Sequence, residues 1–143
     1  MASSFQTIRI DGTDYRHRAV DGHAAVLTEP QYEGAIADAA ASGTVSDDTF
    51  ADLVAHLAKV HPSRYIRLIE GLAAVGLRDV EPFTDQSAAL RFVAFIDRVY
   101  DAELPIRATG LSLDLVFPDE MLAGGYRKKY LRAISRLVAS TLD

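Results

Sequence analysis

One stretch of this sequence, residues 75–109, constrains the fold more than any other. A short apolar run, Gly76–Val80, and a second one, Leu104–Thr109, flank a long segment with apolar residues at spacings of three and four. Thr84 or Asp85 can cap the start of the helix that this spacing predicts. A strand, a helix and a strand in this order form a βαβ unit, whose two strands run parallel. We therefore predict an α/β fold, with α+β as the alternative.

The segment before this unit, residues 30–73, is predicted to be helical. Apolar residues recur at helical spacing in Pro30–Ala41, in Phe50–Val60 and in a third stretch that begins at Pro62 and reaches Ala73. The polar residues between the first two helices leave room for a short strand near Val45. These helices are expected to pack on the βαβ unit.

The first part of the chain, residues 5–28, has the pattern of a β-meander. Three runs of strand-forming residues, Phe5–Ile10, Asp14–Val20 and His23–Thr28, are separated by two Asp-Gly pairs. Asp-Gly is a strong signal for a two-residue hairpin turn, because both turn positions require positive φ. A meander, or at least one hairpin, is therefore predicted at the N-terminus.

Composition and charge limit what the chain can be. Its 143 residues suit a single domain, residues 1–143, and the formal net charge of −5 argues against a general nucleic-acid binder. The absence of cysteine, of a secretory signal and of a long apolar run indicates a cytoplasmic protein without a membrane span. The charge is uneven: residues 1–123 hold ten basic and nineteen acidic side chains, whereas residues 124–143 hold five basic and one acidic.

The basic residues of the C-terminal end form a pattern on a predicted amphipathic helix over residues 124–142. Lys128, Arg132 and Arg136 are four residues apart, so a helix aligns them in one stripe. Gly124 and Gly125 precede this helix and could present backbone amides to an anion. The stripe suits contact with a phosphate, for which the planar guanidinium of arginine is well shaped.

Plainer explanations of the same residues stay open at this point. The glycines can be only a hinge, and the stripe can be a solvated face or an ion-paired one. Tyrosines 126 and 130 fall on the apolar face of the helix. The acidic partners of the stripe would then be Asp114, Asp119 and Glu120.

Other motifs that carry chemistry are missing from the sequence. No G-x-x-x-x-G-K-[ST] phosphate-binding loop and no G-x-S-x-G nucleophile elbow occur. The four histidines are scattered, so no metal site is predicted. Arg91 and Asp97 flank the apolar face of the long helix and are expected to form ion pairs at its edge. Five tyrosines are expected to pack with their hydroxyls at the surface, namely Tyr15, Tyr65, Tyr100, Tyr126 and Tyr130.

Several stretches together resemble the ZapE-type AAA-like ATPases, which include a bacterial cell-division ATPase and its mitochondrial relatives. The resemblance covers residues 5–142 and is weakest over residues 29–49. The chain is similar in particular to the actinobacterial version of the family. The sequences that carry it are Ile10-Asp11-Gly12-Thr13-Asp14-Tyr15-Arg16, Phe50-Ala51-Asp52-Leu53, Arg91–Asp101 (R-F-V-A-F-I-D-R-V-Y-D) and the ending Gly124–Leu137 with its Ser135-Arg136-Leu137.

This resemblance implies a P-loop ATPase that uses Mg-ATP to remodel a partner protein, which for ZapE-like members means cell-division filaments. The family's Walker motifs are absent, so the chain resembles the C-terminal part of such an ATPase and is not expected to hydrolyse ATP alone. Its partners would be the nucleotide-binding core, neighbouring subunits and the client protein. The resemblance further implies that Arg136, or Arg132 one turn earlier, holds the sensor-2 place near the γ-phosphate.

Two other functions are compatible with the residues themselves. The chain can be a stand-alone interaction module whose basic helix docks an acidic partner. It can also be a small nucleotide-sensing domain that uses Gly124, Gly125 and the stripe of Lys128, Arg132 and Arg136. Neither function needs a catalytic group, a metal or a bound cofactor within the chain.

Overall fold

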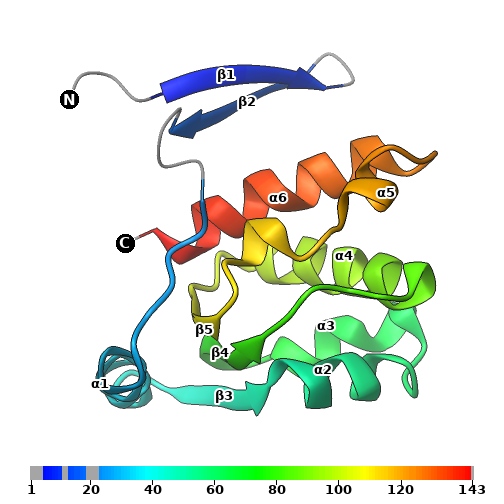
Figure 1. The fold of residues 1–143 in the computed structure, drawn as a ribbon. Coiled ribbons are helices and arrows are strands. Elements are labelled where there is room, and N and C mark those ends of the chain that lie inside the picture. The colour runs from blue at the N-terminus through cyan, green and yellow to red at the C-terminus, as the bar shows by residue number, and fades with distance from the viewer. Residues whose placement is uncertain (1–4, 11–12, 19–22, 143) are drawn as a thin grey trace.

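The computed structural model describes residues 5–10, 13–18 and 23–142, and its centre is a three-stranded parallel sheet (Figure 1). The strands are β3 (Thr44–Thr49), β4 (Leu72–Val80) and β5 (Ile106–Gly110), in the order β3-β4-β5. Helix α4 (Gln86–Asp101) joins β4 to β5. The predicted βαβ unit and the α/β class are therefore confirmed.

Successive residues of β4 point to opposite faces of the sheet. Helices cover both of these faces. Helix α1 (Glu29–Ala40) packs against all three strands on the face that Gly76 presents. On the other face, α2 (Phe50–Leu57) packs on β3 and β4, and α3 (Tyr65–Ile69) and α6 (Arg127–Thr141) pack on α4 (Figure 1). The short helix α5 (Asp119–Leu122) and 3₁₀ turns at Pro62–Arg64 and Leu113–Leu115 complete the described elements.

A chain of aromatic rings fills the core between the sheet and the terminal helix. Phe50 of α2 meets Phe83 and Phe92 with ring centroids 5.3 and 5.4 Å apart. Phe83 lies 5.7 Å from Phe117, which stacks on Tyr130 of α6 at 4.7 Å. Such pairs contribute about 0.5–1.5 kcal/mol each beyond the burial of their area. The rings therefore hold α6 firmly against the body of the molecule.

The helix predicted from Pro62 to Ala73 is wrong in its second half. Helix α3 ends at Ile69, Gly71 adopts a left-handed conformation with φ of +76°, and β4 begins at Leu72. Strand β3 is likewise longer than the short strand allowed near Val45, so residues 30–73 are not all helical. These residues form a strand because β4 is hydrogen-bonded to β3 on one side and to β5 on the other. Pairing with distant segments decides the structure here, and the local spacing of apolar residues does not reveal it.

At the N-terminus, β1 (Phe5–Ile10) and β2 (Thr13–Arg18) are antiparallel, with Ile8 opposite Tyr15. Both predicted Asp-Gly turns, residues 11–12 and 21–22, lie outside the described residues, so the hairpin stays a prediction. The third strand of the meander is wrong, since residues 23–28 form no strand. This segment is joined to the sheet by a backbone hydrogen bond from the amide of Leu27 to the carbonyl of Ala108 at 2.9 Å.

Candidate functional site

Arg136, one of the two predicted nucleotide-contacting arginines, is held between α6 and α4. Its Nη1 donates to Oδ1 of Asp97 at 2.5 Å, and its guanidinium lies 4.9 Å from the centre of the Tyr100 ring. Both charged side chains are largely shielded, with 22% of Arg136 and 29% of Asp97 exposed. The ion pair predicted for Asp97 thus exists, but it is made with Arg136 on another helix. The predicted acidic partners Asp114, Asp119 and Glu120 do not pair with Arg136.

The exposure of the other two residues of the basic stripe differs along the helix. Lys128 is exposed at the start of α6, whereas Arg132 is half-buried one turn later. Both have interactions with other groups. The stripe is therefore not a uniform solvated face, and only its first turn is open to solvent.

Gly124 and Gly125 connect α5 to α6. The amide of Gly124 donates to the carbonyl of Met121 at 3.1 Å, so it already closes the end of α5 and is committed there. Both glycines are exposed, and neither adopts positive φ. The structure thus brings Gly124, Gly125 and Lys128 to one exposed turn, but it separates this turn from Arg136 by more than two turns of helix.

The first turn of α6 carries three consecutive cations, Arg127, Lys128 and Lys129, and no acidic residue. No side chain caps this helix end, and the preceding residue, Tyr126, is 40% exposed rather than part of the apolar face. Positive side chains at a helix N-terminus are disfavoured by the helix dipole. Arg127 donates to the carbonyl of Leu122 at 3.3 Å and Lys128 has an interaction with another group, so these cations are used in part within the fold while they stay exposed to solvent.

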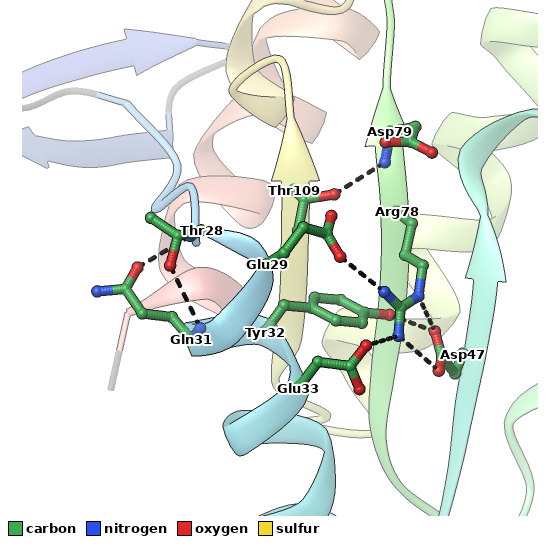
Figure 2. A network of polar contacts seen from close by, with 9 residues as sticks. All are labelled: Thr28, Glu29, Gln31, Tyr32, Glu33, Asp47, Arg78, Asp79 and Thr109. Carbon is green, nitrogen blue, oxygen red and sulfur yellow. Dashed lines mark hydrogen bonds and ion pairs between the residues drawn. The ribbon is translucent and has the colours of Figure 1, made fainter.

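A second polar cluster, centred on Arg78 of β4, was not predicted from the sequence (Figure 2). Its Nε donates to Asp47 at 2.8 Å, Nη1 to Glu29 at 2.9 Å, and Nη2 to Glu33 at 2.9 Å and to Asp47 at 3.2 Å. The guanidinium also lies 4.4 Å from the centre of the Tyr32 ring. The cluster joins α1 to β3 and β4.

The electrostatics of this cluster are those of a closed network. The hydrogen bond from Arg78 is the main reason that the pKa of Asp47 lies below its usual value. Burial, and then the hydrogen bond to Asp47 at 2.8 Å, raise the pKa of the Tyr32 hydroxyl well above its usual value. Bonds to Asp47 and Glu33 raise the pKa of Arg78 further. Since three carboxylates surround one guanidinium, the cluster clamps α1 to the sheet and has no excess positive charge for an anion.

The sequence held little signal for this clamp. Its members come from three elements, and Asp47 meets Arg78 only because β3 and β4 pair in the observed parallel register, with Asp47 opposite Gly76. Asp79, directly after Arg78, has a positive φ of 57°, and its amide donates to the Thr109 hydroxyl at 2.9 Å (Figure 2). Ligands of open α/β sheets often bind at the carboxyl ends of the strands. At this edge the backbone of Asp79 on β4 is tied to Thr109 on β5.

Asp114 forms a third polar cluster that fixes the chain before α1. Its carboxylate is buried and accepts hydrogen bonds from the amide of Ala24 at 2.6 Å, from the Ser112 hydroxyl at 2.5 Å and from Nδ1 of His23 at 2.5 Å. Serine, histidine and aspartate are the residue types of a hydrolytic triad. A triad needs the histidine between the other two. Here the aspartate is in the middle, so the cluster activates no nucleophile and instead fastens residues 23–24 to the loop after β5.

Two tyrosine hydroxyls predicted to lie at the surface are buried instead. The hydroxyl of Tyr65 donates to the carbonyl of Leu57 at 2.8 Å, which ties α3 to the end of α2. Tyr130 is fully buried within the aromatic core. Burial raises the pKa of both hydroxyls.

Two further kinds of feature are absent from the residues that the structure describes. Over residues 5–10, 13–18 and 23–142, no group of three or more histidine, cysteine, aspartate or glutamate side chains could hold a metal ion. Within the same ranges, no helix has both the length and the apolar character that crossing a membrane requires.

Comparison with known proteins identifies one family. Residues 31–142 match the family described as AFG1-like ATPase, which covers most of the chain and begins within α1. The match confirms the resemblance to ZapE-type ATPases over residues 31–142, whereas the motif at residues 10–16 lies outside the matched range. No curated protein and no solved structure matches the chain.

Proposed function

Since the chain belongs to the AFG1-like ATPase family, we propose that it packs against a nucleotide-binding core and does not hydrolyse ATP alone. One observation carries the proposal: a sequence of this ATPase family contains no G-x-x-x-x-G-K-[ST] loop in its 143 residues. That loop supplies the backbone amides and the lysine that hold the β- and γ-phosphates. Mg-ATP would therefore be bound mainly by residues outside this chain.

The terminal helix α6 is the surface that we propose to face the core. It carries five of the fifteen basic residues of the chain, and the aromatic core anchors its other face. An arginine that contacts a γ-phosphate must bring its positive charge to the nucleotide. The charge of Arg136 is already neutralised by Asp97, which supports a positioning role for Arg136 between α4 and α6. We favour Arg132 as the nucleotide-facing arginine on its place in the helix, since it lies one turn nearer the exposed, basic start of α6, with Arg136 setting the position of the helix.

In the assembled ATPase, hydrolysis would be coupled to remodelling of a partner protein, with cell-division filaments as the client by analogy with ZapE-like proteins. Neighbouring subunits are further candidates for contact with α6. We also propose that residues 1–143 form a single domain of this ATPase.

The test separates the two arginines in an ATPase that joins this chain to a nucleotide-binding core. Arg132→Ala should lower kcat by about tenfold, a barrier change of about 1.4 kcal/mol. Arg136→Ala should instead lower the melting temperature, because it leaves the carboxylate of Asp97 without its partner. Full turnover by Arg132→Ala would remove that residue from the nucleotide site.

The cations at the start of α6 support a second candidate function, which is docking of an acidic partner protein without any nucleotide. Arg127, Lys128 and Lys129 are exposed at a helix end that disfavours positive charge. Docking through them would weaken steeply as ionic strength rises, since exposed charges are screened by salt. Thermal stabilisation of the chain by ATP would favour the nucleotide-facing role, and salt-sensitive binding of an acidic protein would favour this one.

A further inference from the structure

A hollow on the sheet face opposite α1, called here the β3 pocket, has the features of a binding site. Its volume is about 360 Å³, and it lies between α2, β3, β4 and α4. Its floor is apolar and includes Leu53 of α2, Val75 and Leu77 of β4, and Phe95 of α4. Ligand pockets in proteins have volumes of about 300–1,000 Å³ and combine an apolar lining with a few polar groups. The β3 pocket therefore has room for at least one large side chain.

The rim of the β3 pocket is acidic. Asp48 of β3 and Asp52 of α2 line it, together with His56 one turn further along α2. All three side chains are exposed, and neither carboxylate pairs with a cation in the described part of the chain. Asp47, by contrast, points to the opposite face and is neutralised by Arg78 (Figure 2). The unneutralised negative charge near β3 is thus concentrated at this pocket.

The strand beside the pocket is an edge strand. β3 pairs with β4 on one side, and no other described strand pairs with it (Figure 1). The outer edge of such a strand offers backbone amides and carbonyls to an added strand. Ser46 and Asp48 alternate with Asp47 along β3, and both of them line the pocket. Side chains of an added strand would alternate in the same way, so every second one would lie on the side of the pocket.

From the pocket, its acidic rim and the adjacent strand edge together, we propose that β3 accepts an extended segment of a partner protein in which basic and apolar residues alternate. The backbone of this segment would add to the edge of β3. Its apolar side chains would enter the β3 pocket, and its lysines or arginines would contact Asp48 and Asp52. Main-chain pairing would give affinity, and the pocket and the two carboxylates would give selectivity.

Other occupants fit less well. A second copy of β3 would bring Asp47 and Asp48 near the same residues of its partner, and like charges opposite each other are destabilising. The basic helix α6 of a second copy has no unpaired backbone to add to a strand. The proposal does not rest on ATP hydrolysis, because the β3 pocket lies at the β3 side of the sheet whereas α6 packs beside β5.

The test uses the 143-residue chain without nucleotide and a synthetic peptide of about nine residues that alternates valine and lysine. We expect a Kd of about 100 μM or tighter at low salt, with amide chemical shifts that change along Thr44–Thr49 and at Leu77. A matched peptide with glutamate in place of lysine should not bind. Equal binding of the two peptides, or shifts confined to residues outside β3, α2 and β4, would overturn the proposal.

Two variants test the charge and the pocket separately. Changing both Asp48→Lys and Asp52→Lys should weaken binding of the basic peptide by about tenfold or more, whereas Glu120→Lys on α5 adds the same kind of charge elsewhere and should not. Ser46→Phe should fill the pocket and abolish binding. Thermal melts establish that each variant is folded, and unchanged affinity in folded Asp48→Lys, Asp52→Lys protein would contradict the proposed contacts.

Discussion

Gly76 sets how closely α1 approaches the sheet. A Cβ atom at this position would lie 2.3 Å from the Tyr32 hydroxyl, 2.7 Å from Cδ1 of Ile36 and 2.8 Å from the carbonyl oxygen of Ser46. Gly76→Ala should therefore lower the free energy of unfolding by about 1–3 kcal/mol, the usual cost of overpacking. Urea unfolding of the wild-type and Gly76→Ala proteins measures this difference in the free energy of unfolding.

The matched control for this substitution is Gly34→Ala on α1. No atom lies within 4 Å of a Cβ added there, and the position is an exposed one within the helix. Alanine is favoured over glycine in a helix by roughly 0.5–1 kcal/mol, so this variant should be more stable. Equal effects at the two positions would mean that the Tyr32 contact does not limit the spacing.

Asp47 gives the clamp between α1 and the sheet a dependence on pH. Its pKa is lower in the folded protein because Arg78 donates to its carboxylate. A carboxyl group with a lowered folded pKa stabilises the protein above its unfolded pKa of about 3.9, and this contribution is lost as the pH falls through the folded pKa. We expect stability to fall on acidification below about pH 4, and Asp47→Asn to fall less steeply. Asp38→Asn, an exposed position on α1 outside the clamp, serves as the control and should keep the wild-type slope in unfolding curves measured across this range.

At the scale of elements, the Arg136–Asp97 ion pair fixes the position of α6 on α4. Arg136→Ala and Asp97→Asn should each destabilise the protein, and the double variant should lose about 1 kcal/mol less than the sum of the two. Arg98–Asp101, an exposed pair at 3.2 Å within α4, serves as the comparison and should show a smaller coupling. Additive effects of Arg136→Ala and Asp97→Asn would show that the contact does not hold the helices together.

Local patterns predicted the elements that are self-contained. The βαβ unit follows from two apolar runs around an amphipathic segment, and Asp85 caps α4 as expected, accepting from the amide of Ala88 at 2.9 Å. The spacing of apolar residues gave a wrong prediction where strand pairing decides the structure. Leu72 and Ala73 were predicted to be helical but belong to β4. The sites were harder to predict, since Arg136 meets Asp97, and Arg78 meets Asp47, only after distant elements have packed.

At the scale of the whole molecule, the two ends of the sheet differ in charge and in what they offer a partner. The β3 side carries an acidic pocket beside an edge strand, and the β5 side is flanked by the basic helix α6. This arrangement suits a region that contacts a nucleotide-binding core on one side and a partner protein on the other.

The central claim, that this member of the AFG1-like ATPase family supplies no complete ATPase site by itself, is tested most directly by ATP turnover of the purified 143-residue chain with Mg²⁺. We predict no phosphate release above the background of a buffer control, at any ATP concentration. The contradicting result is turnover that saturates with ATP, depends on Mg²⁺ and is lost in Arg132→Ala or Arg136→Ala protein that remains folded.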